Sequence, residues 1–370
     1  MKILHVITSL RTGGAEKLMV DLLPRLRRKG DEVDLLLFDG TPTPFLHQLE
    51  DLGIRIFSLS IGENVYTPLN IFRLRRFMLG YDIVHTHNTA CQLFVPLARL
   101  ITRSKPLLFT TEHSTSNRRR GKWYLHPIDC WMYGQYSRII AISAKAAELL
   151  AQHIGRNDIS VIENGIDVQR YAQATPIDRH AIVPDYHTGD IIITMVAAFR
   201  VGKDQDSAIR ALTHLPENYK LCLVGDGERR NIIEALIVQL GLQQRVMLLG
   251  IRSDVPNILS ASHVVVLASH WEGLSLSSVE GMASGKPFIA SDVDGLREVI
   301  GGNGILFADG DHHQLATAIA ELMEHPEHYH KVATACAKAA LRYDIATTAT
   351  RYSNLYHESI STTSETLIYG

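Results

Sequence analysis

Short apolar segments alternate with helical segments along almost the whole chain. Strands that are separated by helices pair in parallel, so this alternation predicts an α/β fold in which helices cover both faces of parallel sheets. Helical patterns such as 15–28 and 90–100 lie between the strands. The predicted strands are residues 3–7, 33–38, 55–58, 82–85, 107–111, 138–142, 160–162, 190–198, 220–224, 246–249, 263–268, 287–290 and 304–307.

A cluster of turn-forming residues at 163–167 interrupts this alternation. Less regular sequence with Pro176 and Pro184 follows before the strands resume. A chain of 370 residues is long enough for about two domains of ~150 residues each. We therefore predict two doubly wound, Rossmann-like domains that face each other across a cleft, the first ending at residue 166 and the second spanning 167–344.

The composition, with 46% hydrophobic and 21% charged residues, is that of an ordinary globular protein. No uncharged apolar run approaches the ~18 residues of a membrane span. His5 and Arg11 interrupt the N-terminal apolar segment too early for a signal peptide. The cysteines have no paired spacing, which indicates reduced thiols and a cytoplasmic protein; they are Cys91, Cys130, Cys222 and Cys336.

The two halves of the chain differ in charge although the net charge is only −2. Residues 1–166 contain 21 Lys and Arg against 15 Asp and Glu, whereas residues 167–370 contain 16 against 24. A basic half suggests an anionic partner. No nucleic-acid-binding motif accompanies the charge, so we expect no nucleic acid partner.

Aromatic residues interleave the basic clusters at 73–76 and 118–122. This combination favours an anionic membrane surface, where each basic residue contributes about 1 kcal/mol. We therefore predict peripheral association with the inner face of the cell membrane. The alternative, that these clusters are solvated helix faces, stays open. The interleaved aromatic residues are Phe72, Phe77, Trp123 and Tyr124.

A loop and a short helix lie between the predicted strands 263–268 and 287–290. The helix begins near Ser275, at the carboxyl end of a strand, and Gly285 ends it. Ligands bind at that edge of an open α/β sheet. The backbone amides at a helix start carry partial positive charge and suit a phosphate. The amides predicted to bind here are those of Gly273, Leu274, Ser275 and Leu276.

Glu272 and Glu280 lie on either side of these amides, eight positions apart. On one helix this spacing corresponds to about 12 Å, too far for a paired acid and base. We interpret them as two separate hydrogen-bond acceptors, one for ribose hydroxyls and one for sugar hydroxyls, with a phosphate between them. This arrangement suits a sugar nucleotide. The alternative is a surface loop with two incidental glutamates.

The run from Glu272 to Ile300 resembles the signature of retaining glycosyltransferases of family 4, which have the GT-B fold. The resemblance implies metal-independent transfer of a sugar from a nucleotide donor, with Glu280 holding the ribose and Glu272 holding sugar hydroxyls. It also implies that a terminal helix, at about 345–370, returns to the first domain. This sequence departs from the commoner pattern at Leu274 and Ser275, where Phe-Gly is frequent, which affects the shape around the donor sugar.

Arg200 and Lys203 follow the first strand of the second domain. Two cations at a strand's carboxyl end can neutralise a diphosphate and stabilise it as it leaves with extra charge. They are similar to the Arg/Lys pair of family 4. Solvated basic residues on a loop are the alternative.

Glycine-rich loops follow two other strands and are predicted to face the donor. Gly13 and Gly14 precede the first helix, and Gly225 and Gly227 follow the strand at 220–224. Neither loop is a dinucleotide fingerprint, because the third glycine is missing, and a tight strand-to-helix turn explains Gly13 and Gly14 equally well. Ile251 would lie near the base in the family interpretation.

Two histidines lie at predicted strand ends of the first domain. His113 is similar in position to the family histidine near the donor sugar and the reacting hydroxyl, and His87 is our candidate for acceptor binding. The Asp204-x-Asp206 and Asp292-x-Asp294 pairs and His312–His313 are typical of metal sites. We expect no metal, because basic residues already face the diphosphate and the histidines are predicted to be exposed.

The sequence therefore predicts a retaining glycosyltransferase without cofactor. Its donor is a nucleotide sugar, with a UDP-sugar favoured, and its acceptor is a saccharide or a lipid-linked saccharide in bacterial surface polysaccharide or glycoconjugate assembly. Two alternatives are a nicotinamide-dependent oxidoreductase and a sugar-nucleotide-binding protein without catalysis. The broken glycine fingerprints disfavour the first, and the complete set of charged residues disfavours the second.

Overall fold

The computed structural model describes residues 1–11, 13–113 and 122–369, with side chains described as far as residue 362. The chain divides into two units. Unit 1 comprises Met1–Gly165 and Ile345–Gly370, and unit 2 comprises Ile166–Asp344. Both divisions fall within one residue of the boundaries expected from the sequence. Thr12 of the first glycine loop and the basic cluster at 118–121 lie outside the described residues.

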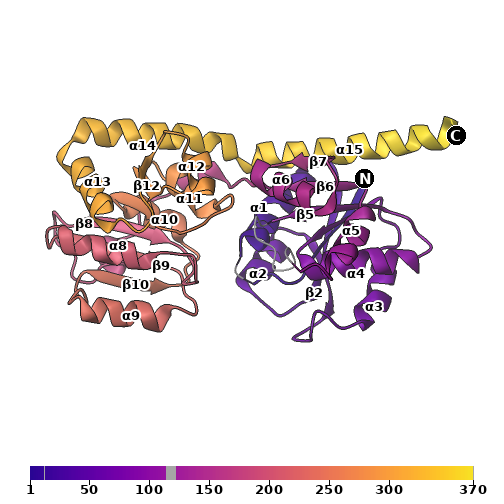
Figure 1. The fold of residues 1–370 in the computed structure, drawn as a ribbon, viewed down its shortest axis with the longest axis horizontal. Coiled ribbons are helices and arrows are strands. Elements are labelled where there is room, and N and C mark those ends of the chain that lie inside the picture. The colour runs from indigo at the N-terminus through magenta and orange to yellow at the C-terminus, as the bar shows by residue number, and fades with distance from the viewer. Residues whose placement is uncertain (12, 114–121, 370) are drawn as a thin grey trace. The chain divides into compact units, whose positions relative to one another are not determined.

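The described part of unit 1, which is indigo to magenta in Figure 1 with α15 in yellow, contains a parallel sheet. The sheet has seven strands in the order β3-β2-β1-β4-β5-β6-β7. In the central strand β1, Ile3 lies beside Val33 of β2 on one side and Ile83 of β4 on the other. The strands are β1 (Lys2–Ile7), β2 (Glu32–Asp39), β3 (Arg55–Ser60), β4 (Ile83–His87), β5 (Leu107–Glu112), β6 (Arg138–Ala141) and β7 (Ile159–Val161).

Alternate residues of these strands enter two separate cores, because successive side chains of a strand point to opposite faces. Ile3 and Ile7 pack with α1, α2 and α15, whereas Leu4 and Val6 pack with helices α3 to α6 on the other face. The helices are α1 (Gly14–Arg28), α2 (Pro44–Asp51), α3 (Leu69–Phe77), α4 (Thr89–Leu100), α5 (His126–Gly134), α6 (Ala144–Ile154) and α15 (Ile345–Tyr369).

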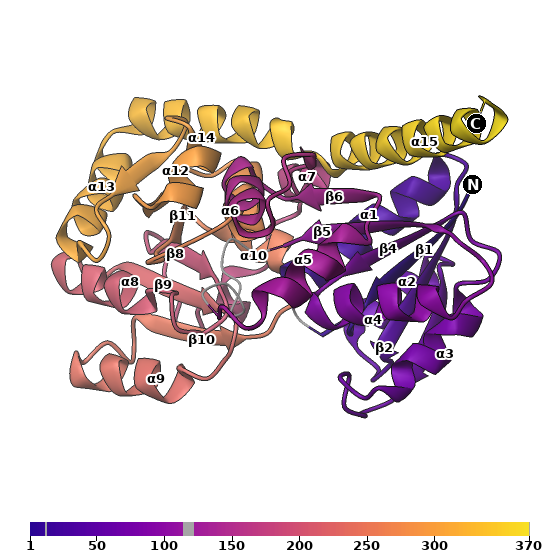
Figure 2. The ribbon, with the colours of Figure 1, turned by 45° about the vertical axis from the view of Figure 1, so that its right-hand side comes forward.

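The terminal helix α15 belongs to unit 1, as the sequence predicted, and lies beside α1 (Figure 2). Ile345, Ala349, Tyr352 and Tyr356 are each fully buried. Their spacing places them on one stripe of the helix, and this stripe closes the core over β1. The last segment of the chain is therefore a structural part of the first domain.

The described part of unit 2 contains a six-stranded parallel sheet with the order β10-β9-β8-β11-β12-β13. Its strands are β8 (Ile191–Val196), β9 (Tyr219–Val224), β10 (Val246–Gly250), β11 (Val264–Leu267), β12 (Phe288–Ser291) and β13 (Ile305–Phe307). Its helices are α7 (Val168–Ala172), α8 (Gln205–Ala211), α9 (Arg230–Gln239), α10 (Val255–Ala261), α11 (Leu276–Ala283), α12 (Asp294–Ile300), α13 (His312–Glu324) and α14 (Pro326–Ala340), with short 3₁₀ turns η1 (Arg179–Ala181), η2 (Leu212–His214) and η3 (Leu341–Tyr343).

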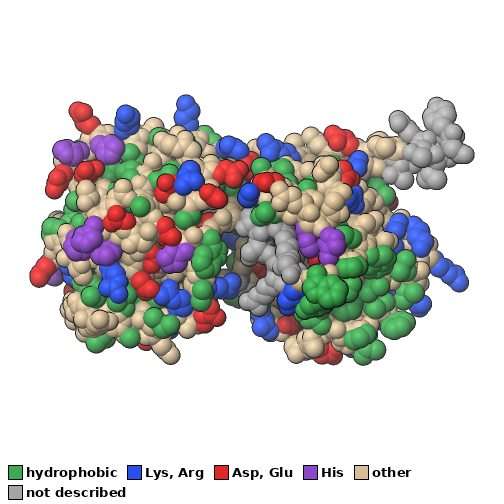
Figure 3. Space-filling view, viewed as in Figure 1, with side chains coloured by type: hydrophobic (Ala, Val, Ile, Leu, Met, Phe, Trp, Pro, Cys, Tyr) green, Lys and Arg blue, Asp and Glu red, His purple; other side chains and the backbone are tan. Residues whose placement is uncertain are grey.

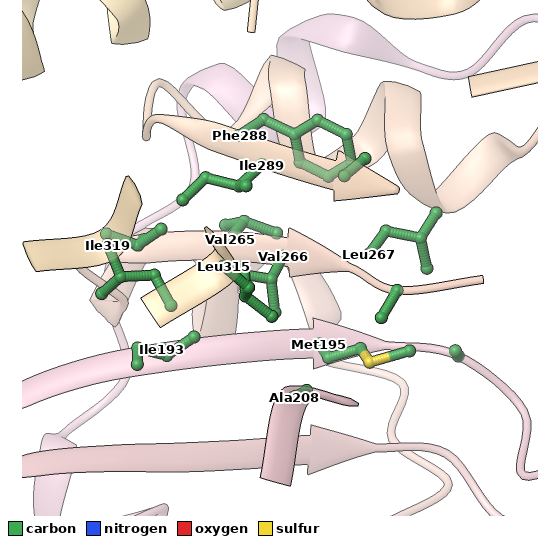
Figure 4. Packing of buried hydrophobic residues seen from close by; sticks show 14 of the residues in the cluster. Ile193, Met195, Ala208, Val265, Val266, Leu267, Phe288, Ile289, Leu315 and Ile319 are labelled. Atoms are coloured by element: carbon green, nitrogen blue, oxygen red, sulfur yellow. The ribbon is translucent and has the colours of Figure 1, made fainter. Parts of the chain in front are cut away.

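The core of unit 2 forms between neighbouring strands and the helices packed on them (Figure 4). Ile193 and Met195 of β8, Val266 of β11, and Leu315 and Ile319 of α13 are all at most 2% exposed. Burial of such side chains is the main stabilising term, at about 1.5–3 kcal/mol each. These contacts hold β8 and β11 together, and so they fix the strand ends that carry the candidate site.

Each predicted strand is present, with ends that differ by a few residues. Both sheets have the doubly wound order in which the connection reverses direction beside the first strand. The reversal lies between β1 and β4 in unit 1 and between β8 and β11 in unit 2. The space outside the carboxyl ends at such a switch point is where open α/β sheets bind ligands.

No helix in the described part of the chain combines the length and hydropathy needed to cross a bilayer.

Candidate active site

The loops that follow β8 and β11 are joined at the switch point of unit 2. His270 N donates a 2.9 Å hydrogen bond to Gly202 O, and Ser269 Oγ donates another of the same length. Lys203 and Ser269 form an antiparallel bridge. The loop with Arg200 and Lys203 and the loop with Glu272 therefore form one structure, although about 70 residues separate them in the sequence.

Lys203 Nζ forms an ion pair with Glu272 Oε1, and Ser269 Oγ lies 3.0 Å from the same oxygen. The two charged side chains are 21% and 11% exposed. Arg200 is exposed, one turn earlier in the β8 loop, where Lys203 N donates to Arg200 O. Two residues that the sequence assigned to separate parts of a ligand are thus in direct contact.

Helix α11 begins at Leu276, directly after the loop with Glu272. Ser275 and Glu280 are 6% and 8% exposed, and Gly273, Leu274 and Leu276 are partly exposed. Gly281 brings the helix close to the sheet, because a Cβ there would meet the Phe288 ring at 2.6 Å. The helix therefore packs closely on β11 and β12, and it begins after β11 near the residue that the sequence predicted.

Gly295, in the first turn of α12, supports the Glu272 loop from behind. A Cβ at this position would lie 2.1 Å from Gly273 O and 2.4 Å from Glu272 O. The sequence analysis did not identify this role, because a single glycine after a strand gives no signal of what packs against it.

Gly225 and Gly227 are required by close backbone packing. Their φ values are +139° and +159°, and added Cβ atoms would lie 2.1 Å from Ala197 O and 2.4 Å from Phe199 O. Gly225 N also donates to Gly250 O. These contacts join the loops after β8, β9 and β10. Contact of either glycine with a donor stays a prediction, as does that of Ile251, which is 68% exposed.

Three histidines of unit 1 form a hydrogen-bonded chain at its switch point. His5 Nδ1 lies 3.0 Å from His87 Nε2, and His87 Nδ1 lies 2.9 Å from His113 Nε2. His5 and His87 are fully buried and His113 is partly exposed. The sequence placed His87 just beyond its strand, as an acceptor-binding residue. In the structure it is the last residue of β4, and both ring nitrogens are occupied by histidines, so its position does not suit direct acceptor contact.

Burial keeps these imidazoles neutral. It lowers the pKa of His5 from 6.5 to about 3 and that of His113 to about 4. Burial, and secondarily the neighbouring histidines, also lowers the pKa of His85 and His87 well below 6.5. His85 belongs to a separate network through Thr111 and Tyr356.

Asn88, directly after His87, was not identified from the sequence. Its φ of 74° is left-handed, the only such value at a non-glycine residue among those described. Its Nδ2 donates a 2.9 Å hydrogen bond to Thr8 Oγ1, which joins the ends of β4 and β1. Non-glycine residues with positive φ cluster at functional sites.

Gly13 caps α1 in an extended conformation, and Gly14 has open space around it.

Three groups of side chains in the described ranges have donor atoms close enough to share a metal ion. In the group His5, His85 and His87 the rings are nearly parallel, and hydrogen bonds already occupy the facing nitrogens. The other two groups are His214–His312–His313 at the surface, and Asp204 with the exposed His270 and Asp309. The absence of a metal stays a prediction.

Comparison with known proteins identifies the family. The model described as "Glycosyl transferases group 1" matches residues 179–339, and the model "Glycosyltransferase Family 4" matches residues 12–170. Together the two matches cover most of both units. The chain belongs to glycosyltransferase family 4.

Relatives extend over most of this family 4 enzyme. The lipopolysaccharide core biosynthesis glycosyltransferase LpsD of Rhizobium meliloti is 29% identical over 332 residues, covering 88% of this chain and 89% of the relative. The Escherichia coli UDP-Gal:alpha-D-GlcNAc-diphosphoundecaprenol alpha-1,3-galactosyltransferase is 26% identical over 318 residues, 80% of each chain.

The fold is shared with Anabaena Alr3699/HepE, solved in complex with UDP, with a TM-score of 0.82 at 23% identity over 97% of this chain and 100% of that chain. The family 4 enzyme is therefore a glycosyltransferase with the GT-B fold, as predicted. The oxidoreductase and the non-catalytic binding protein are excluded as alternatives. The match over residues 179–339 contains Lys203, Glu272 and Glu280, and the match over residues 12–170 contains Gly13, His87 and His113.

Proposed function

We propose that the enzyme transfers a sugar with retention of anomeric configuration from a UDP-sugar bound to unit 2. The contact between Lys203 and Glu272 is the observation that carries the proposed nucleotide-sugar site. In a nucleotide sugar, the sugar hydroxyls lie a few ångströms from the phosphate that the sugar is bonded to. A cation for the phosphate and a carboxylate for the hydroxyls must then be neighbours, and here they are.

The remaining roles follow from position. Arg200 and Lys203 bind the diphosphate and stabilise the charge that develops as it leaves. The amides at the start of α11 bind the same group, and Glu280, in the next turn of the helix, accepts hydrogen bonds from the ribose. Two cations and the partial positive charge of a helix start are available to the diphosphate, so we propose transfer without a metal.

A UDP donor is favoured by the relatives. HepE was solved with UDP and with UDP-glucose, and the name of the E. coli relative specifies UDP-Gal. That name also specifies a diphosphoundecaprenol-linked acceptor. We propose a lipid-linked saccharide as the acceptor here, in surface polysaccharide assembly, with the enzyme on the cytoplasmic side of the membrane.

The surface of unit 1 supports a membrane location. Hydrophobic side chains gather over α3, α4 and α5 in Figure 3. Phe72 of α3 is 65% exposed, Trp123 before α5 is 85% exposed, and Ile128 of α5 is 47% exposed. Arg75 and Arg76 are exposed on α3. Apolar side chains beside cations suit an anionic lipid surface.

A thermal-shift panel of UDP, GDP and ADP sugars without metal, on wild type and Glu280→Ala, tests the donor site. A ligand at one hundred times its Kd adds about 2.7 kcal/mol of stability. We expect stabilisation by UDP sugars alone and a smaller shift for Glu280→Ala. The anomeric configuration of the product, determined by NMR, tests retention. An inverted product, or wild type that no UDP sugar stabilises, would overturn the proposal.

A further inference from the structure

We propose that His5 and His87 fix the tautomer of His113, so that His113 presents a neutral Nδ1–H donor at the switch point of unit 1. The three residues come from β1, β4 and the end of β5, three neighbouring strands in the sheet. His5 and His87 are positioning residues here, because only His113 is partly exposed. This inference rests on the proposed function only for the identity of the oxygen that receives the hydrogen bond.

The chain of contacts permits two proton arrangements. Each neutral imidazole has one N–H and one lone pair, so every contact needs a donor on one side and an acceptor on the other. In the first arrangement His5 Nδ1–H donates to His87 Nε2, and His87 Nδ1–H donates to His113 Nε2. The proton of His113 is then on Nδ1. In the second arrangement every donor is reversed, and His113 Nδ1 carries a lone pair.

The buried end of the chain selects between these arrangements. His5 Nε2 is buried and has no hydrogen-bond partner in the described ranges. Each arrangement leaves one buried N–H without an acceptor among the described residues, at His113 Nδ1 in the first and at His5 Nε2 in the second. His5 is fully buried whereas His113 is partly exposed, so only the N–H of the first arrangement lies where solvent or a ligand can supply an acceptor. The first arrangement leaves only a lone pair at His5 Nε2. The geometry therefore favours protonation of all three rings at Nδ1.

The outer end of the histidine chain, at His113, has a ring nitrogen available to a ligand. His113 Nδ1 is also buried and without a partner among the described residues. An unsatisfied N–H of this kind is costly unless a ligand oxygen accepts from it. Burial lowers the pKa of His113 to about 4, which agrees with a neutral ring. The ring then acts as a hydrogen-bond donor to a hydroxyl or another oxygen, and it is not available as a general base.

NMR of the protein labelled with ¹⁵N-histidine tests the tautomer directly, because protonated and unprotonated ring nitrogens have distinct chemical shifts. We expect His113, assigned from a His113→Gln sample, to be protonated at Nδ1 alone in the absence of any substrate. This measurement does not require turnover, so it separates failure of this inference from failure of the proposed function.

A variant that reverses the hydrogen-bond donors tests the role of the three-histidine chain. His5→Asp places an acceptor opposite His87 Nε2. It should therefore reverse the donors and acceptors along the histidine chain and move the proton of His113 to Nε2. Transfer activity should fall about tenfold or more. His5→Asn can donate from its amide N–H as well as accept through its oxygen, so it permits the original tautomer, which His5→Asp does not. His85→Gln is the matched control, because His85 is an equally buried neighbour outside the chain.

Two results would overturn the inference. One is wild-type His113 protonated at Nε2 or at both nitrogens. The other is an unchanged His113 tautomer in a folded His5→Asp protein. If His5→Asp does not fold, the wild-type tautomer decides the matter.

Discussion

Lys203 and Glu272 form an ion pair that joins the two loops at the switch point of the unit 2 sheet. Both side chains are largely buried, so neither charge is fully solvated if the other is removed. Such a pair has two consequences that mutagenesis can separate. Loss of one partner leaves an uncompensated charge, whereas loss of both removes the charges from the site.

Lys203→Met should destabilise unit 2 by about 1–3 kcal/mol, because the Glu272 carboxylate loses its cation. The double variant Lys203→Met/Glu272→Gln should regain part of that stability. Transfer activity should fall about tenfold to a hundredfold in Lys203→Met and should not recover in the double variant. Urea unfolding and UDP release measure the two effects. Recovery of activity in the double variant would show that the pair is structural only.

Gly295→Ala should weaken donor binding with little effect on other parts of the enzyme. The new methyl group would displace the backbone of Glu272 and Gly273, which it would otherwise overlap. We expect about a tenfold rise in the donor KM and a stability loss of about 1–3 kcal/mol. Gly134→Ala, where a Cβ meets nothing within 4 Å, is the control. Equal kinetics for the two variants would contradict this role of Gly295.

The stability of unit 1 should fall as the pH drops below about 6.5. Buried histidines with lowered pKa bind fewer protons when folded than when unfolded, so the stabilisation is complete above the unfolded pKa and is lost on acidification. For His5 the loss continues towards its folded pKa of about 3. Each such histidine contributes up to about 1.4 kcal/mol per pH unit.

His5→Asn should flatten this dependence by one histidine's contribution, as measured by urea unfolding between about pH 6 and about pH 4. His47→Asn, which replaces an exposed histidine, is the matched control. Parallel stability curves for wild type and His5→Asn would show that His5 is protonated in the folded protein.

The enzyme should bind vesicles that contain anionic lipid more tightly than zwitterionic vesicles, and salt should weaken the binding. Because each cation contributes about 1 kcal/mol, Arg75→Glu/Arg76→Glu should reduce vesicle affinity by about tenfold or more. Arg210→Glu/Lys331→Glu makes the same charge change on exposed residues of unit 2. Equal affinity of the two variants in vesicle sedimentation would argue against the α3 surface.

The sequence was informative wherever the pattern is local. Alternating strands and helices, the break near residue 165 and the helix start after Glu272 all appear in the structure where they were predicted. The positions of Arg200, Lys203 and Glu272 at strand ends follow from the same pattern, because each lies directly after an apolar run.

Contacts between distant segments were not predictable from the sequence. Nothing in the order of residues shows that Glu272 faces Lys203, that Gly295 supports the Glu272 loop or that Asn88 bonds to Thr8. These contacts depend on which strands are neighbours in the sheet, and periodicity identifies strands without giving their order.

The sequence by itself determined the fold class, the two sheets and the group of residues available for donor chemistry, because burial and turn formation depend on residue type and spacing. Only the tertiary structure decided how those residues act together. It placed β1 beside β4, which brought His5 against His87 and His87 against His113. Three histidines that looked independent became one hydrogen-bonded chain, because hydrogen bonds require distances that only the packed sheet sets.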